Sequence, residues 1–293
     1  MIPGSFEYHR PSTVEDAARL LAQHGGEAQA LAGGHSLIPM MKLRMAAPAH
    51  LVDLQGVAGL SGIEVGADAI AIGAMTTQHA LITDAALAEA APLVREAALQ
   101  IADPQVRYVG TLGGNVANGD PGNDMPGLMQ CLDATFTLAG PNGSREVRAR
   151  EFYFGAYDTA RAEDEILARV RFAPHRGAGW AYEKQKRKIG DYATAAAAVL
   201  IRMEGGRCAA ASIAMTNLAD RPIFSEGAGA ALVGTGVDEA AVAAAVAAMQ
   251  GDISPAQDNR GPVEFKRHVA GVMLRRAIAR AAERAAKVSG GAA

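Results

Sequence analysis

The segment Leu31–Arg44, with the sequence LAGGHSLIPMMKLR, constrains the fold more than any other part of the chain. Two adjacent glycines, Gly33 and Gly34, follow a short apolar run, and His35 and Ser36 precede the next one. A simple turn needs only one glycine with an Asn or Asp. A Gly-Gly-X-Ser segment leaves backbone N–H groups uncovered by Cβ atoms, as in loops that bind phosphate. A tight strand-to-helix turn with positive φ explains the two glycines equally well.

A second glycine pair, in TLGGN (residues 111–115), favours the phosphate interpretation, because Thr111 and Asn115 again flank the glycines with small polar groups. Neither segment is a GxGxxG or Walker A motif, so a Rossmann or P-loop site is not predicted. Two such loops that converge on one site would hold the two phosphates of a dinucleotide. Asp120 and Asp124 follow in NGDPGND. A carboxylate beside a phosphate binds ribose hydroxyls, since like charges repel, and Asp120 is better interpreted as a turn cap.

Composition excludes several other classes of protein. The chain has 293 residues and a net charge of −3, with no basic arm, so nucleic acid is not an expected partner. Cys131 and Cys208 are the only cysteines, which argues against a disulfide framework, a thiolate metal site or a four-cysteine iron–sulfur cluster. The N-terminal segment lacks the apolar stretch of a signal peptide, and a cytoplasmic protein is expected. No catalytic residue and no metal ligand is predicted.

Hydrophobic periodicity predicts a chain of mixed helices and strands. Ser12 and Glu15 form a capping box before a helix that Gly25 and Gly26 end. The expected elements, in chain order, are strands at 28–32 and 50–54, a hairpin in 62–77, helix in 78–102 with a break at Pro92, a hairpin in 134–149, a strand at 165–172, two strands in 192–218, and helices at 238–250 and 263–287. The Gly-, Pro- and charge-rich segment 173–180 separates two expected domains, 1–175 and 176–293.

The pairing of AGGHSLIPMMKLR with TLGGNVANGDPGNDMP resembles the FAD-binding medium subunits of the molybdenum hydroxylases, the xanthine dehydrogenase family. The likeness extends from MIPGSFEYHRP to GVMLRRAIARA. Within the family, IADPQVRY, NGDPGNDMP and YEKQKRKIGDYATAAAAV are most similar to the medium subunits of aerobic carbon monoxide dehydrogenases. Medium subunits of relatives that act on N-heterocycles or aldehydes are the alternative. A free-standing flavin-dependent oxidoreductase is a further one, although the alanine-rich C-terminal third carries no catalytic constellation.

The resemblance implies an α+β fold with FAD as the cofactor. A two-part FAD-binding domain, with a small parallel α/β part and a larger, mostly antiparallel part, would precede a C-terminal domain of a short antiparallel sheet with helices. Backbone N–H groups of both glycine segments would hold the FAD diphosphate, and Tyr192 would lie over the flavin ring. The implied cofactor contacts are Ala32, Gly33, Gly34, His35, Ser36, Ile101, Thr111, Leu112, Gly113, Gly114, Asn115, Asp124, Leu167, Lys184 and Tyr192.

The resemblance also implies partner chains. A large subunit with a molybdenum–pterin centre would oxidise the substrate, and a small subunit with iron–sulfur clusters would pass the electrons to the flavin, in a dimer of three-chain units. The external acceptor expected here is a quinone or another membrane-linked carrier, because the chain has no GxGxxG motif for NAD. Contact with the inner face of the cell membrane would be peripheral at most.

Overall fold

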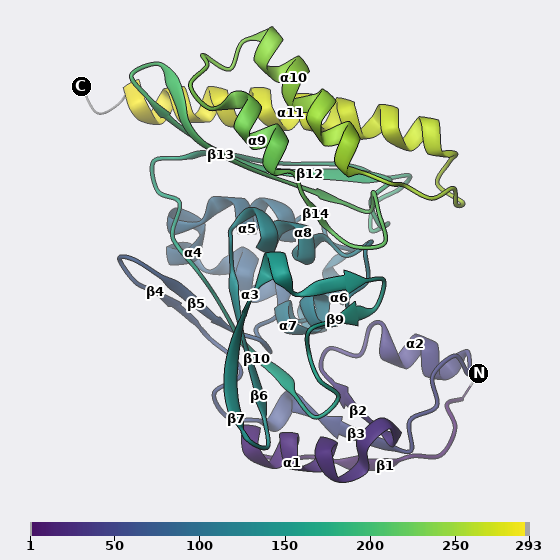
Figure 1. Cartoon of the computed structure of the whole chain (residues 1–293). Coiled ribbons are helices and arrows are strands. Elements are labelled where there is room, and N and C mark those ends of the chain that lie inside the picture. Colours follow the sequence, from purple (N-terminus) through teal and green to yellow (C-terminus); the bar gives the residue numbers. More distant parts are fainter. Residues whose placement is uncertain (1, 291–293) are drawn as a thin grey trace.

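The N-terminal part of the molecule is a small parallel sheet with helices. We describe residues 2–290 of a computed structural model (Figure 1). Three parallel strands lie in the order β1 (Glu7–His9), β3 (His50–Asp53) and β2 (Ala28–Leu31). Helix α1 (Val14–His24) packs on this sheet, and α2 (Leu37–Lys42) lies between β2 and β3 in sequence. The strands expected at 28–32 and 50–54 are therefore confirmed.

Helix α1 begins one residue later than the capping-box pattern predicts. Thr13 is the N-cap, and its side chain accepts a hydrogen bond from the backbone N–H of Asp16 at 3.1 Å. The prediction for Ser12 and Glu15 was wrong because Thr13 and Asp16 offer the same capping chemistry in the next register. The apolar residues of α1 then point to the sheet, with Ala17, Ala18 and Leu21 buried.

The central part is an antiparallel five-stranded sheet next to a group of short helices. Its strands lie in the order β4 (Ile63–Val65), β5 (Ile70–Gly73), β10 (Ile166–Phe172), β6 (Thr135–Gly140) and β7 (Gly143–Arg148). The helices are α3 (Gln78–Thr83), α4 (Ala85–Ala90), α5 (Pro92–Ala98), α6 (Pro104–Val109), α7 (Leu112–Ala117) and α8 (Asp124–Cys131). A two-stranded sheet pairs β8 (Tyr153–Gly155) with β9 (Asp158–Thr159). Both predicted hairpins and the predicted strand at 165–172 are confirmed.

The predicted helical stretch 78–102 consists of three helices. Asp84 ends α3 and caps α4, accepting a hydrogen bond from the backbone N–H of Leu87 at 2.7 Å. Pro92 is the first residue of α5, a position where its missing N–H costs nothing. The break expected at Pro92 is confirmed, and the break at Asp84 is an additional one that the sequence reasoning missed.

The C-terminal part is a sheet with helices on one face and the central part on the other (Figure 1). Its antiparallel strands are β11 (Gly179–Gln185), β12 (Ala195–Glu204), β13 (Arg207–Thr216) and β14 (Ile223–Phe224). The helices are α9 (Glu226–Leu232), α10 (Glu239–Asp252) and α11 (Val263–Gly290). The backbones of β11 and α11 approach closely, because a Cβ at Gly179 would lie 1.9 Å from the carbonyl oxygen of Ala281. Small side chains thus allow α11 to lie directly on the sheet.

Three hydrophobic clusters are centred on the three parts, and the central cluster extends to Tyr182 and Ala196 of the C-terminal sheet. The N-terminal core includes Val52 and Leu60, the central one Phe136 and Phe152, and the C-terminal one Ile213 and other buried residues. This arrangement agrees with the expected α+β fold of a two-part domain followed by an antiparallel sheet with helices. Within residues 2–290 we find no helix whose length and apolar character would let it cross a membrane.

Candidate functional site

A cavity of about 610 Å³ lies between the N-terminal and central parts. This volume is within the usual range for small-molecule and cofactor sites. Both glycine segments reach it, as do residues from β9, β10 and the loop between them. Eleven of the predicted contact residues line this cavity: Ala32, Gly33, Gly34, His35, Ser36, Ile101, Thr111, Gly113, Gly114, Asn115 and Leu167.

The first glycine segment touches the backbone of Val109 and Gly110, which lead directly into the second segment. A Cβ added to Gly33 would lie 2.6 Å from the carbonyl oxygen of Val109 and 2.8 Å from the Cα of Gly110. Gly34 is the member of the first pair with positive φ, at +73°. A need for positive φ therefore explains Gly34 but not Gly33, which is required because another backbone occupies the space of its side chain.

Four backbone N–H groups of the second segment, those of residues 112–115, are already engaged within the protein. Those of Leu112 and Gly113 donate to the carbonyl oxygens of Thr76 and Ala74 at 2.9 and 2.7 Å. Those of Gly114 and Asn115 donate to the side chain and carbonyl of the N-cap residue of α7 at 3.0 and 3.1 Å. The second segment thus shapes the cavity floor.

The first segment differs in this respect. Among the described residues, no acceptor takes the backbone N–H groups of Gly33, Gly34, His35 or Ser36, all of which line the cavity. Uncovered N–H groups in a row favour an anionic ligand. The diphosphate-binding chemistry expected of both segments is therefore available, in this structure, on the first.

Polar groups that the sequence reasoning missed complete the cavity wall. The Oε1 atom of Gln78 is buried without a hydrogen-bond partner in the described structure, so it offers an acceptor to a ligand N–H or O–H group. Arg161 places a cation on the wall; burial lowers the pKa of its guanidinium, which nevertheless stays protonated at neutral pH. Its Nη1 atom donates to the carbonyl oxygens of Ala162 and Glu165, each at 2.8 Å. Asn118 and Asn123 also line the cavity, and both lie in the segment NVANGDPGND, which follows the second glycine pair.

Four predicted contact residues do not line the cavity. Leu112 is buried in the central core. Asp124, at the start of α8, and Lys184, on β11, form an ion pair with each other at 2.8 Å, and their side chains are 6% and 1% exposed. The Tyr182 hydroxyl donates to the same carboxylate at 2.5 Å, and burial and this negative charge raise the pKa of the phenol. The pair joins the central part to the C-terminal sheet.

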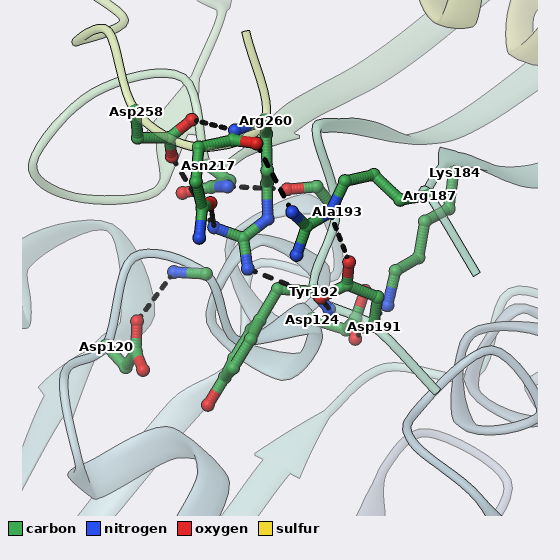
Figure 2. A network of polar contacts seen from close by, with 12 residues as sticks. Asp120, Asp124, Lys184, Arg187, Asp191, Tyr192, Ala193, Asn217, Asp258 and Arg260 are labelled. Atoms are coloured by element: carbon green, nitrogen blue, oxygen red, sulfur yellow. Dashed lines mark hydrogen bonds and ion pairs between the residues drawn. The ribbon is translucent and has the colours of Figure 1, made fainter. Parts of the chain in front are cut away.

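Tyr192 is the fourth of these residues and belongs to the loop between β11 and β12. Its side chain packs against Gly122, and the guanidinium of Arg260 lies over its ring at 5.6 Å (Figure 2). Asp191 fixes this loop through ion pairs with Arg187 at 2.8 Å and with Arg260 at 3.3 Å. Burial and the charge of Asp120 raise the pKa of the Tyr192 phenol.

Asp120 has the capping role that the sequence favoured. Its Oδ1 atom accepts a hydrogen bond from the backbone N–H of Gly122 at 2.9 Å. The turn that it caps leads into α8, and Gly122 in this turn packs against the Tyr192 ring. The cavity as a whole combines uncovered N–H groups, a half-buried cation, a spare amide acceptor and apolar wall residues such as Leu54. This set of groups fits a dinucleotide such as FAD.

Comparisons with known proteins match both halves of the chain. Residues 4–174 match the FAD binding domain in molybdopterin dehydrogenase, and residues 180–281 match the CO dehydrogenase flavoprotein C-terminal domain. The carbon monoxide dehydrogenase medium chain of Afipia carboxidovorans is 57% identical over 97% of this chain and 99% of its own length. That of Hydrogenophaga pseudoflava is 46% identical over 95% of this chain and 97% of its own length.

A solved structure agrees with these matches. One chain of a crystal structure of the Cu,Mo-CO dehydrogenase, in a cyanide-inactivated form, superimposes with a TM-score of 0.95 at 57% identity. The match covers 97% of this chain and all of the other. With both domain families matched and relatives aligned over nearly its whole length, the chain belongs to the FAD-binding medium subunits of the molybdenum hydroxylase family.

Proposed function

We propose that this chain is the FAD-carrying medium subunit of an aerobic carbon monoxide dehydrogenase. The observation that carries the cofactor part is the row of uncovered N–H groups at Gly33–Ser36 on the cavity wall. Support for the substrate comes from the two relatives at 57% and 46% identity, both of which are carbon monoxide dehydrogenase medium chains. In this proposal the substrate itself reacts on another chain.

The residues of the cavity would divide the task of holding FAD. The first glycine segment (residues 32–36) would bind the diphosphate through its N–H groups, and Arg161 would balance the negative charge. Gln78 would accept a hydrogen bond through its spare Oε1 atom. The second segment (residues 111–115) would fix the floor through its internal hydrogen bonds. When bound, FAD accepts electrons singly and releases them as a pair, whereas the protein supplies binding and orientation.

The predicted residues that do not line the cavity would affect the cofactor through the protein segments that they position. Asp124 and Lys184 would position the segment that leads to Ile101, because Lys184 Nζ donates to the carbonyl oxygen of Gln100 at 3.2 Å. Tyr192 would cover the flavin ring after a movement of its loop. The division into domains 1–175 and 176–293 is part of this proposal, and it falls in the interval between the two matched families.

Partner chains would supply the electrons. A molybdenum–pterin large subunit and an iron–sulfur small subunit would assemble with this chain in a dimer of heterotrimers. A quinone or a similar membrane-linked carrier would accept the electrons, in a cytoplasmic enzyme with at most peripheral contact with the membrane. NADH formation by the complex at a rate that matches substrate oxidation would contradict this choice of acceptor.

The test is the anaerobic visible spectrum of the complex that co-purifies with this chain. Carbon monoxide is expected to bleach the flavin absorbance. Bleaching by dithionite but not by carbon monoxide would overturn the proposed substrate and favour an N-heterocycle or an aldehyde. A complex without flavin would contradict the cofactor assignment itself.

A further inference from the structure

Three histidines that are far apart in sequence meet on the N-terminal parallel sheet. His9 is the last residue of β1, His24 ends α1, and His50 begins β3. Glu7 pairs with His50 across β1 and β3, so Glu7, His9 and His50 share one face of the sheet. Val52 lies on the same face and packs in the core with residues of α1. The helix therefore brings its last residue, His24, over the other two imidazoles.

The ring nitrogens of this cluster are close enough to share one ion. Nε2 of His9 and Nδ1 of His50 are 3.1 Å apart, and the rings of His24 and His50 stack with their centroids at 3.7 Å. One nitrogen from each ring lies within 4.8 Å of the others. A carboxylate oxygen of Glu7 lies 3.5 Å from His50 Nδ1 and 4.0 Å from His9 Nε2. The cluster thus contains three imidazoles and an adjacent oxygen ligand.

This set of donors suits a divalent transition metal. Zn²⁺ in proteins takes four ligands in a tetrahedron with Zn–N distances of about 2.0–2.1 Å, which places the nitrogens roughly 3.4 Å apart. The separation between the His9 and His50 nitrogens is already close to that value. His24 would reach the same distance by side-chain rotation, since no hydrogen bond joins its ring to any other residue in the described part of the chain. Imidazole ligands favour transition metals over Mg²⁺ and Ca²⁺, which prefer oxygen.

We propose that His9, His24 and His50 bind one divalent transition-metal ion of the Zn²⁺ type, with Glu7 or water as the fourth ligand. The ion would tie β1, α1 and β3 together at the amino ends of β2 and β3. The first glycine segment follows the carboxyl end of β2, at the opposite edge of the sheet, so the ion takes no part in electron transfer. Its role is to fix the sheet from which that segment extends.

The experiment measures zinc in the complex that contains the full chain without an affinity tag. The complex is dialysed against Zn²⁺ and then against metal-free buffer, and the metal is counted by mass spectrometry. The variants are His9→Gln and His24→Gln, and the control is His268→Gln, an exposed histidine on α11. Flavin absorbance, compared among all samples, reports whether each variant remains folded and assembled.

The wild type and the control are expected to retain about one Zn²⁺ per chain. Each cluster variant removes a ligand, so its affinity should fall by more than the roughly 10–100-fold that loss of a second-shell group costs. Hydrogen exchange of β1 and β3 amides should slow with Zn²⁺ in the wild type and in the control, but not in the two cluster variants. Absence of retained zinc in the wild type would overturn the proposal, and so would cluster variants that retain as much zinc as the wild type. Retained zinc without slower exchange would contradict the proposed tie between the elements.

Discussion

Asp124 and Lys184 show how a residue can matter to a cofactor site without contacting the cofactor. Family resemblance implies that both touch FAD, but in the structure they neutralise each other between α8 and β11. Lys184 also reaches the carbonyl oxygen of Gln100, next to the wall residue Ile101. A buried ion pair depends on both of its charges, because either one alone would remain desolvated and unpaired.

Removal of one charge should therefore be costly. We expect Lys184→Met to lower the free energy of unfolding by about 3–5 kcal/mol, because Asp124 would remain buried without its cation. Lys188→Met, at an exposed position of the same basic run, should change it by less than about 0.5 kcal/mol. Urea denaturation of the three proteins measures both values, and equal stability of the two variants would contradict the structural role of the pair.

His175 should make the stability depend on pH. Its ring is buried, Nδ1 has no partner within the described structure, and burial lowers the pKa to about 4. The unfolded chain binds a proton at this residue near pH 6.5. Stability from His175 is thus constant above pH 6.5 and falls as the pH decreases towards 4, by roughly 3 kcal/mol in total.

Unfolding curves between pH 7 and pH 4 test this expectation, because the slope per pH unit reports the proton that only the unfolded chain binds. His175→Gln should show a smaller slope than the wild type, whereas the exposed control His268→Gln should keep it. A slope that does not change in His175→Gln would show that this imidazole is already protonated, or accessible, in the folded protein.

At the scale of elements, the sequence predicts strands better than it predicts the glycine-rich helices. Alternating and apolar runs identify β2, β3, β10, β12 and β13, because their patterns are local. Helix α7 contains Gly113 and Gly114, which disfavour a helix, and it forms because Thr111 caps it and Ala74 accepts one of its N–H groups. Both glycine segments could be predicted as a site, but which N–H groups remain uncovered depends in part on acceptors more than thirty residues away, such as the carbonyl oxygens of Thr76 and Ala74.

The start of α1 gives a direct test at this scale. Thr13→Ala removes the side chain that accepts the Asp16 N–H and should lower the free energy of unfolding by about 1 kcal/mol. Ser12→Ala changes a neighbouring exposed side chain that makes no capping bond, and it should have almost no effect. If Ser12→Ala lowered the free energy of thermal or urea unfolding more than Thr13→Ala, Ser12 would be the N-cap, as the sequence pattern predicted.

At the scale of the whole molecule, the cavity belongs to the first two parts, and none of its wall residues lies beyond Leu167. In the C-terminal part, Lys184 binds the carbonyl oxygen of Gln100, next to the wall residue Ile101, and Tyr192 packs against Gly122, next to the wall residue Asn123. Family resemblance anticipated the order of these parts, which hydrophobic periodicity alone could not provide. Hydrophobic periodicity also could not show that Lys184 and Tyr192 lie outside the cavity, because their positions depend on how the parts pack together.

We propose that FAD binds in the cavity that both glycine segments line, and the FAD content of the assembled complex tests this placement most directly. Gly33→Ala would place a Cβ 2.6 Å from the Val109 carbonyl oxygen and push the first segment away from the chain that leads into the second, whereas Gly251→Ala adds a methyl group to open space on α10. We expect the Gly33 variant to assemble with much less FAD per chain than the wild type, and the Gly251 variant to bind the full amount. Full FAD occupancy in Gly33→Ala would contradict this placement of the cofactor.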